Sequence, residues 1–159
     1  MNRRVFSAII MLALAAVPIP AHSQDAQENP QITSSSSGPI SDMMIGSRYG
    51  QAELKASALG SSYGFSTEFP VGVGGGFSDG SKNTYRFLNA LLGPKGQKVH
   101  YRRIGTCCEF ETENSPFDGR GLLEVYEITY EGIEEPVRLY FNWYDAGKLL
   151  IPVGFKAVK

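Results

Sequence analysis

Two neighbouring stretches, residues 121–132 and 136–144, constrain the fold of this chain most. The first, GLLEVYEITYEG, carries apolar side chains at both alternating sets of positions until near its end, which is typical of a strand in the middle of a sheet. The second, PVRLYFNWY, alternates with period two, and this pattern predicts a strand with one strongly apolar face. That face comprises Val137, Leu139, Phe141 and Trp143.

The stretch SKNTYRFLNALLGPKG, residues 81–96, predicts the best helix of the chain. Ser81 can cap the first turn, and Gly93 followed by Pro94 ends the helix. Between these limits, apolar side chains recur at helical spacing and form one stripe. The stripe comprises Tyr85, Leu88, Leu91 and Leu92.

Three further stretches predict strands: FPVGVGGGF at 69–77, QKVHYRRIG at 97–105 and KLLIPVGF at 148–155. We expect the last to pair with residues 136–144 as a hairpin across the turn at 145–147. The fold is then α+β, with a mostly antiparallel sheet of four to five strands and one helix packed on a face. Because the helix stripe and the sheet face can cover each other, we expect five side chains to be largely buried: Leu88, Leu91, Leu139, Phe141 and Trp143.

The N-terminal part of the chain predicts export. Residues 1–23 combine a basic start, an apolar run and small residues before a cleavage point, which is the layout of a secretory signal peptide. Residues 24–62 begin with a stretch of Gln, Ser, Asn and Pro that has hardly any large apolar residue, and we expect a flexible leader there. Residues 63–159 then form a single domain, which we expect in the periplasm or secreted, with no transmembrane segment in the mature chain.

The charge balance argues against polyanionic partners. Removal of residues 1–23 takes away two arginines and no acidic residue, which leaves 13 basic against 16 acidic side chains. A nucleic-acid-binding domain usually has a clear basic excess, so we expect no nucleic-acid partner. The partner that we expect is another envelope protein or a small-molecule ligand.

No pattern predicts a cofactor or a metal. The glycine run at 72–76 lacks the third glycine of a dinucleotide fingerprint, because Phe77 stands at that position. Without residues 1–23, His100 is the only histidine, and a lone histidine in a strand is more often structural than catalytic. Together with Cys107 and Cys108 it supplies at most three zinc ligands. We therefore expect neither cofactor nor metal, and catalytic residues are unknown.

The adjacent pair Cys107 and Cys108, in RIGTCCEF, is the most unusual feature of the chain. An exported chain meets oxidising conditions, and the only intramolecular bridge available joins these two neighbours. Adjacent Cα atoms lie about 3.8 Å apart, below the usual disulfide range of about 4.4–6.8 Å, so the bridge is strained and easily reduced. The alternative is two buried, reduced cysteines. Neighbours of this candidate thiol or disulfide site are His100, Arg102, Arg103 and Glu109.

Aromatic side chains and one carboxylate are weaker candidates for a site. Glu124 shares a strand face with Leu122 and Tyr126, which predicts that it is partly buried. The aromatic residues of the last strands can form the floor of a ligand groove, although core packing explains most of them equally well. They are Tyr126, Tyr130, Tyr140, Phe141, Trp143 and Tyr144.

Several segments together resemble a known family. The stretches TYRFLNALLGPKGQ, TCCEF, GLLEVYE and IPVGF are similar to segments of small exported bacterial proteins that are common in Bacteroidetes and largely uncharacterised. Members carry YLNALAGPNGE, CCPF, GLLDVYE and a final PVGF. The resemblance covers residues 63–155, and Glu109 stands where the family usually has proline. Many members are labelled 2-dehydro-3-deoxyphosphooctonate aldolase, so the resemblance implies that activity as one alternative.

Three functions remain open at this point. The first is a non-catalytic binding or structural module of the cell envelope. The second is a thiol- or metal-linked activity at Cys107 and Cys108. The third is the aldolase activity, against which the length of the chain argues, because a (β/α)₈ barrel needs about 250 residues and eight strand–helix units.

Overall fold

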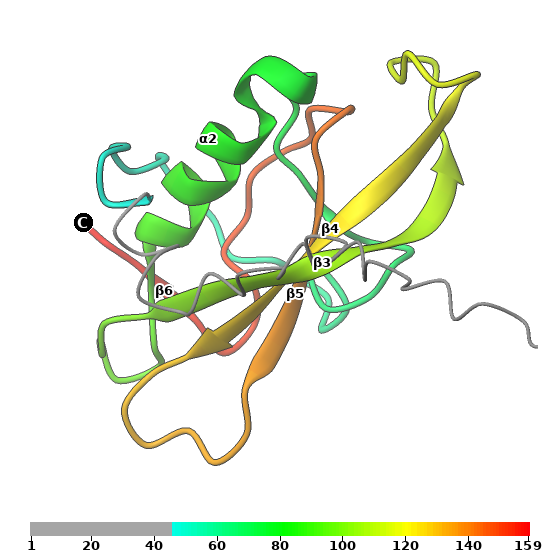
Figure 1. Ribbon diagram of the computed structural model, residues 1–159. Coiled ribbons are helices and arrows are strands. Elements are labelled where there is room, and N and C mark those ends of the chain that lie inside the picture. Colours follow the sequence, from blue (N-terminus) through cyan, green and yellow to red (C-terminus); the bar gives the residue numbers. More distant parts are fainter. Residues whose placement is uncertain (1–45) are drawn as a thin grey trace, which may run out of the picture. The chain divides into compact units, whose positions relative to one another are not determined.

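The computed structural model describes residues 46–159, and these form one helix, a four-stranded sheet and a two-stranded sheet (Figure 1). The predicted α+β class is confirmed. The elements are β1 (Val71–Gly72), α2 (Gly76–Asn89), β2 (Leu91–Leu92), β3 (His100–Glu111), β4 (Arg120–Thr129), β5 (Val137–Asn142) and β6 (Lys156–Ala157).

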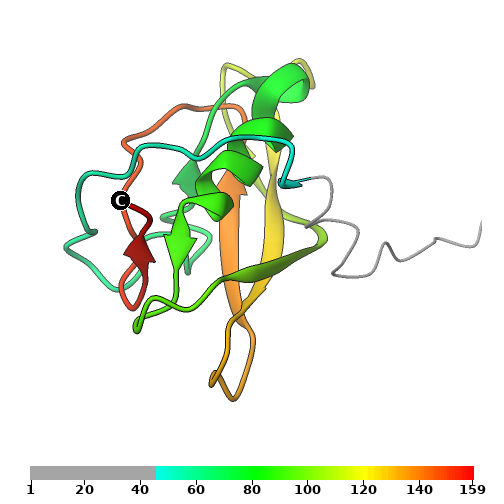
Figure 2. The same ribbon diagram turned by 90° about the vertical axis from the view of Figure 1, so that its left-hand side faces the viewer.

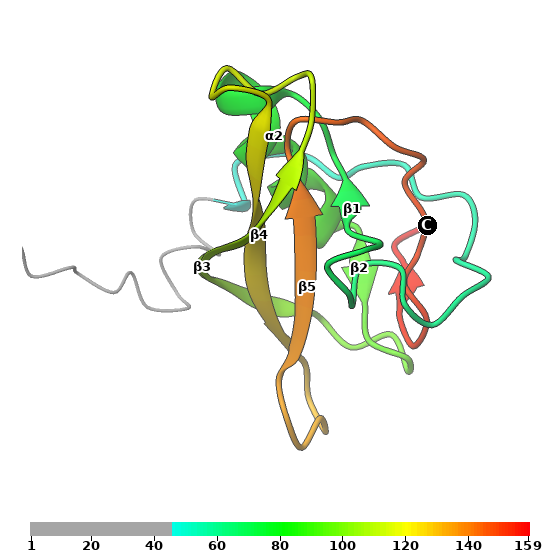
Figure 3. The same cartoon turned by 90° about the vertical axis from the view of Figure 1, so that its right-hand side faces the viewer.

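The larger sheet has the strand order β1-β5-β4-β3. The long pair β3 and β4 is antiparallel, as is β4 with β5, and β1 runs parallel to β5 at the opposite edge (Figure 3). The predicted central position of residues 121–132 is confirmed, because β4 lies between two partners. Both of its faces bury side chains: Leu123 is 1% exposed and Tyr126 on the other face is fully buried.

The predicted hairpin between residues 136–144 and 148–155 is wrong. The neighbour of β5 is β1, in which Val71 pairs with Phe141, while β6 pairs with β2 and Ile151 makes an isolated bridge with Ser57. The reason lies at Asn142, whose side-chain oxygen accepts the backbone N–H groups of Tyr144 and Asp145 at 2.8 and 3.1 Å. These bonds turn the chain away from the sheet, and Pro152 further along has no N–H to donate to a ladder.

Helix α2 begins five residues before the predicted cap at Ser81. Its N-cap is Gly75, which has the left-handed φ of 97° that favours glycine. The side-chain amide of Asn83 donates to the carbonyls of Val73 and Gly74, both at 3.2 Å, and so ties the glycine-rich loop to the helix. The early start places Phe77 on the first turn, on the same side of the helix as the buried Thr84 and Leu88 but two to three turns before them.

The core lies between α2 and one face of the larger sheet (Figure 2). Phe87 from the helix meets Phe141 from β5 with ring centroids 5.6 Å apart. Burial of a large apolar side chain stabilises the fold by about 1.5–3 kcal/mol, so this layer contributes much of the stability. Four predicted core residues are at most 2% exposed, namely Leu88, Leu91, Leu139 and Phe141. Trp143 is only partly buried, because it lies at the open end of this layer.

Residues 46–62 pack along the domain, although the sequence analysis placed them in a flexible leader. The Ala52 N–H donates to the Arg86 carbonyl at 2.8 Å, and the Tyr49 ring stacks on Tyr85 with centroids 5.8 Å apart. Backbone hydrogen bonds and a few well-placed apolar side chains explain this order despite the polar composition. The predicted signal peptide at 1–23 and residues 24–45 of the predicted leader lie outside the described residues. None of the helical residues in 46–159 forms a segment long and apolar enough to cross a bilayer.

Candidate functional site

The adjacent cysteines lie in the middle of β3, with their sulfur atoms 2.22 Å apart, at disulfide distance. The bridge expected from the sequence is therefore present in the structure. Cys108 is exposed and Cys107 is half-buried, so the pair is not enclosed in the core. This exposure differs from the alternative of two buried thiols.

Cys108 is the extra residue of a β-bulge. Cys107 pairs with Leu123 of β4, and Glu109 pairs with the next residue, Leu122, so Cys108 has no partner in the register. Its φ of 60° is left-handed, which is uncommon for a residue other than glycine. A second irregularity of the same kind leaves Ile104 without a partner.

The two bulges bring three side chains of β3 to one face of the sheet. Side chains normally alternate between faces, so residues three apart point in opposite directions. Each bulge inserts one unpaired residue into β3, so that two residues three apart on either side of a bulge point to the same face instead. Arg103, Thr106 and Glu109 consequently lie across from Tyr126, Glu124 and Leu122, which all share a face of β4.

The predicted neighbours of the cysteines are therefore divided. Arg103 and Glu109 lie on the face that carries Glu124, whereas Arg102 points to the other face and forms an ion pair with Glu127. His100 begins β3, seven residues before Cys107. At about 3.3 Å a residue this places His100 roughly 20 Å from the cysteine, too far for a joint site.

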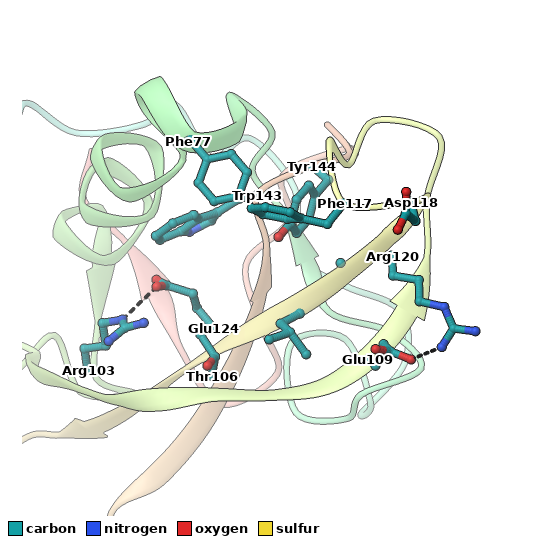
Figure 4. Close-up of a pocket in the computed structure, with 12 residues that line it drawn as sticks. Phe77, Arg103, Thr106, Glu109, Phe117, Asp118, Arg120, Glu124, Trp143 and Tyr144 are labelled. Carbon is teal, nitrogen blue, oxygen red and sulfur yellow. Dashed lines mark hydrogen bonds and ion pairs between the residues drawn. The ribbon is translucent and has the colours of Figure 1, made fainter.

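A pocket of about 550 Å³ opens on this face, at the end of the sheet that α2 does not cover (Figure 4). Its walls come from the first turn of α2, the loop between β3 and β4, and the end of β5. Its floor comes from β3 and β4. The lining residues are Phe77, Arg103, Thr106, Glu109, Phe117, Asp118, Arg120, Gly121, Leu122, Glu124, Trp143 and Tyr144.

A glycine allows the Trp143 wall to form. A Cβ atom on Gly80 of α2 would lie 2.5 Å from Cγ of Trp143, so only glycine permits the indole to lie flat against the helix. The indole N–H then donates to the Thr84 hydroxyl at 3.0 Å, and that hydroxyl donates to the Gly80 carbonyl at 3.0 Å. The indole is thereby held in one orientation.

Two exposed phenylalanines complete the aromatic wall. Phe77 and Phe117 are 59% and 62% exposed, and their rings meet edge to face with centroids 5.4 Å apart. Phe77 also contacts Tyr144 at 5.9 Å between centroids. Edge-to-face contacts of this kind are favourable, and they join the segments that carry Phe117 and Tyr144 to the first turn of the helix.

The floor of the pocket carries a partly buried ion pair. Nε of Arg103 donates to Oε1 of Glu124 at 2.7 Å, and Glu124 is only 2% exposed. Burial lowers the pKa of Arg103, but the hydrogen bond and the charge of Glu124 outweigh it, so the pKa of Arg103 is raised. Burial, followed by the charge of Glu124, also raises the pKa of the Tyr126 phenol below. The arginine therefore stays charged under all ordinary conditions.

The rim carries a second, exposed ion pair, in which Arg120 donates to Glu109 across the strands. Asp118 lies nearby in the loop between β3 and β4, at a left-handed φ of 48°. Among residues 46–159 the structure gives Asp118 no ion pair, so two arginines face three carboxylates around the pocket. The lining thus has a net negative charge.

Asp145 fixes the loop that carries Phe117. Its carboxylate accepts hydrogen bonds from Thr112, Asn114 and Asn142 at 2.8, 2.7 and 2.9 Å. Burial raises the pKa of Asp145, but these three hydrogen bonds outweigh it, so the pKa is lowered. The ionised carboxylate joins the β3–β4 loop to the end of β5.

The sequence indicated several lining residues for other reasons. Arg103 and Glu109 were predicted as neighbours of the cysteines and Glu124 as partly buried, while Trp143 and Tyr144 were among the aromatic groove candidates. No sequence pattern indicated Phe77 and Phe117 as site residues. The available signal was a large aromatic residue inside a turn-forming stretch, GGGFSDG or SPFDGR, where no core position requires one.

Within residues 46–159, no three His, Cys, Asp or Glu side chains are grouped so that they could hold a metal ion.

Comparison with known proteins adds no relative. No family model, no curated protein and no solved structure matches this chain. The family resemblance described above stays a prediction, and the site is interpreted from its own geometry.

Proposed function

We propose that this chain is a non-catalytic binding domain whose pocket takes a small organic cation with a flat apolar body. The observation that carries the proposal is the aromatic wall. Phe77 and Phe117 expose more than half of their surface, yet both turn toward the same pocket as Trp143. Large apolar side chains gathered in an exposed concavity are typical of a binding site.

The dimensions support a small ligand. A pocket of about 550 Å³ lies within the range of about 300–1,000 Å³ that is usual for small-molecule sites. Its aromatic walls come from three separate segments, which Thr84 and Asp145 hold in place. The pocket is thus largely formed before the ligand arrives, which limits the ordering cost of binding.

The charges favour a cation. Glu124 and Glu109 each engage an arginine, and Asp118 adds one further negative charge at the mouth. Aromatic faces also carry negative potential and attract ammonium or guanidinium groups. A ligand with a positive group close to a ring or an alkyl body satisfies both features.

The same ion pairs support binding rather than catalysis. A catalytic carboxyl group must be able to reach the substrate, whereas Glu124 and Glu109 are each already engaged in an ion pair with an arginine of the pocket. His100, a possible proton carrier, lies at the start of β3 and does not line the pocket. The signal-like residues 1–23 support a place outside the cytoplasm, in the periplasm or secreted.

Fluorescence of the chain tests the proposal directly, because Trp143 is the only tryptophan. Titration of the full chain with phenyltrimethylammonium should quench or shift the emission with saturation. Benzenesulfonate, which has a ring of the same size and a negative charge, should bind at least tenfold more weakly. Equal responses to both compounds would contradict the charge argument.

Two phenylalanines provide a matched pair of variants. Phe69 and Phe77 are both 59% exposed, but only Phe77 lines the pocket. We expect Phe77→Ser to weaken phenyltrimethylammonium binding at least fivefold and Phe69→Ser to leave it unchanged. Similar losses in both variants would show that the probe binds to exposed apolar surface in general.

The two alternatives from the sequence stay predictions with their own tests. A thiol- or metal-linked activity requires metal or reactive sulfur at Cys107 and Cys108, which metal analysis and thiol titration of the purified chain measure. The aldolase alternative requires turnover of phosphoenolpyruvate with arabinose 5-phosphate. The described residues contain one helix and a mostly antiparallel sheet, an architecture unlike the barrel of eight strand–helix units.

A further inference from the structure

The bulge at Cys108 connects the disulfide to the pocket. If Cys108 were paired as in a regular strand, Glu109 would lie on the opposite face from Thr106, because residues three apart then point in opposite directions. With the bulge, Glu109 lines the pocket and meets Arg120 at the rim. The position of one pocket residue therefore depends on the backbone of its neighbour in the bridge.

The two bulges of β3 are supported differently. The first contains Gly105, which has a φ of 147°, a value that glycine adopts without a side-chain clash. The second contains Cys108 at a φ of 60°, where a Cβ atom is unfavourable. The covalent ring between Cys107 and Cys108 is the feature that distinguishes the second bulge, and it restrains the backbone of both residues.

We propose that reduction of the Cys107–Cys108 disulfide weakens ligand binding in the pocket, so that binding responds to the redox state of the surroundings. This inference rests on the proposed binding function. Reduction opens the ring and lets Cys108 leave the left-handed region. The bulge then relaxes, Glu109 moves away from Arg120, and the rim loses its ordered ion pair.

The chemistry is a thiol–disulfide exchange with a dithiol reductant. A thiolate of the reductant attacks one sulfur, the Cys107–Cys108 bond breaks, and a mixed disulfide forms. The second thiol of the reductant then displaces the remaining cysteine. The disulfide has gained two electrons and two protons and becomes two thiols, while the reductant becomes a disulfide. Solvent exposure of Cys108 gives the attacking thiolate access.

The test compares phenyltrimethylammonium binding by the full chain with and without dithiothreitol, with Trp143 emission as the readout. Thiol titration verifies that two thiols appear on reduction. We expect the reduced chain to bind at least fivefold more weakly while its far-UV circular dichroism stays the same. Unchanged affinity after release of two thiols would overturn the proposal, and so would a reduction that unfolds the domain.

A pair of double variants separates the backbone from the sulfur chemistry. Cys107→Ala with Cys108→Ala removes the bridge and should bind like the reduced chain. Cys107→Ala with Cys108→Gly also removes the bridge but allows a positive φ at 108, and it should bind within twofold of the oxidised chain. Neither should respond to dithiothreitol. Equal affinities in the two variants would overturn the proposed role of the bulge.

The outcomes distinguish the two proposals. If the oxidised chain does not bind phenyltrimethylammonium, or if Phe77→Ser has no effect, the binding function itself fails and the regulation fails with it. If the oxidised chain binds as expected and reduction changes nothing, only the redox regulation fails. Binding measurements on the native chain, oxidised and reduced, distinguish these two failures even if a variant does not fold.

Discussion

Helix α2 carries two phenylalanines ten residues apart, and their surroundings differ sharply. Phe87 is fully buried against Phe141, whereas Phe77 is 59% exposed and contacts Phe117 and Tyr144 edge to face. At 1.5 Å a residue, about 15 Å of helix separates the two. One helix thus closes the core at one end and borders an open pocket at the other.

The comparison shows how one sheet face can serve two purposes. Where α2 covers the face, Tyr126 and its neighbours form a dry core without any exposed ring. Where α2 no longer covers the sheet, the next residue on the same face of β4 is Glu124, and its ion pair with Arg103 replaces apolar packing. We therefore expect stability to be concentrated in the first region and the proposed ligand binding to be located in the second.

The largest expected effect is at Phe87. We expect Phe87→Ala to lower the free energy of unfolding by about 3–5 kcal/mol, because it leaves a cavity in the core. Phe77→Ala should lower it by less than about 1 kcal/mol, because the ring is already in water. Urea unfolding followed by circular dichroism measures both. Comparable losses would contradict the division of the helix into two regions.

Gly80 lies where the two regions meet. Gly80→Ala places a methyl group against the indole of Trp143, and we expect it to destabilise the fold by about 1–3 kcal/mol. Alanine is otherwise the better helix former, so a stabilised variant would show that the indole moves away freely. Gly50→Ala is the control, because a Cβ atom there meets nothing within 4 Å. Thermal unfolding and Trp143 emission are the measurements.

The two ion pairs of the pocket should differ in the same way. Arg103→Leu removes the partner of a buried carboxylate, and we expect a loss of about 1–3 kcal/mol in the free energy of unfolding. Arg120→Leu removes the partner of the exposed Glu109 and should cost less than about 1 kcal/mol. Denaturant unfolding at neutral pH compares them. Equal effects would mean that Glu124 is solvated.

The smallest effect concerns the loop that Asp145 holds. Its pKa is below the ordinary value of 3.8, so the ionised carboxylate favours the folded state. This contribution is fully present above pH 3.8 and disappears as the pH falls through the lowered pKa. We expect Asp145→Asn to be slightly less stable than the wild type at pH 7 and to lose less stability on acidification to pH 3. Parallel pH profiles of the two proteins would contradict this.

Features that depend on neighbours along the chain could be predicted from the order of residues alone. The mixed apolar pattern of residues 121–132 predicted a central strand, and the helical stripe with Leu88 and Leu91 predicted buried residues; both are confirmed. The adjacency of Cys107 and Cys108 left a single possible bridge within the chain, which is present. Each follows from local periodicity or covalent geometry, which the order of residues records directly.

Features that join distant segments follow from contacts that form only in the folded chain. The parallel pairing of Val71 with Phe141 replaced the predicted hairpin, and the approach of Phe77, Phe117 and Trp143 built the pocket. The register shift at Cys108 decided on which face Glu109 lies. Local patterns do not encode these choices, because each depends on the competition between long-range contacts and the entropy of closing the loops between them. A single extra residue in a strand then reverses the direction of every side chain that follows.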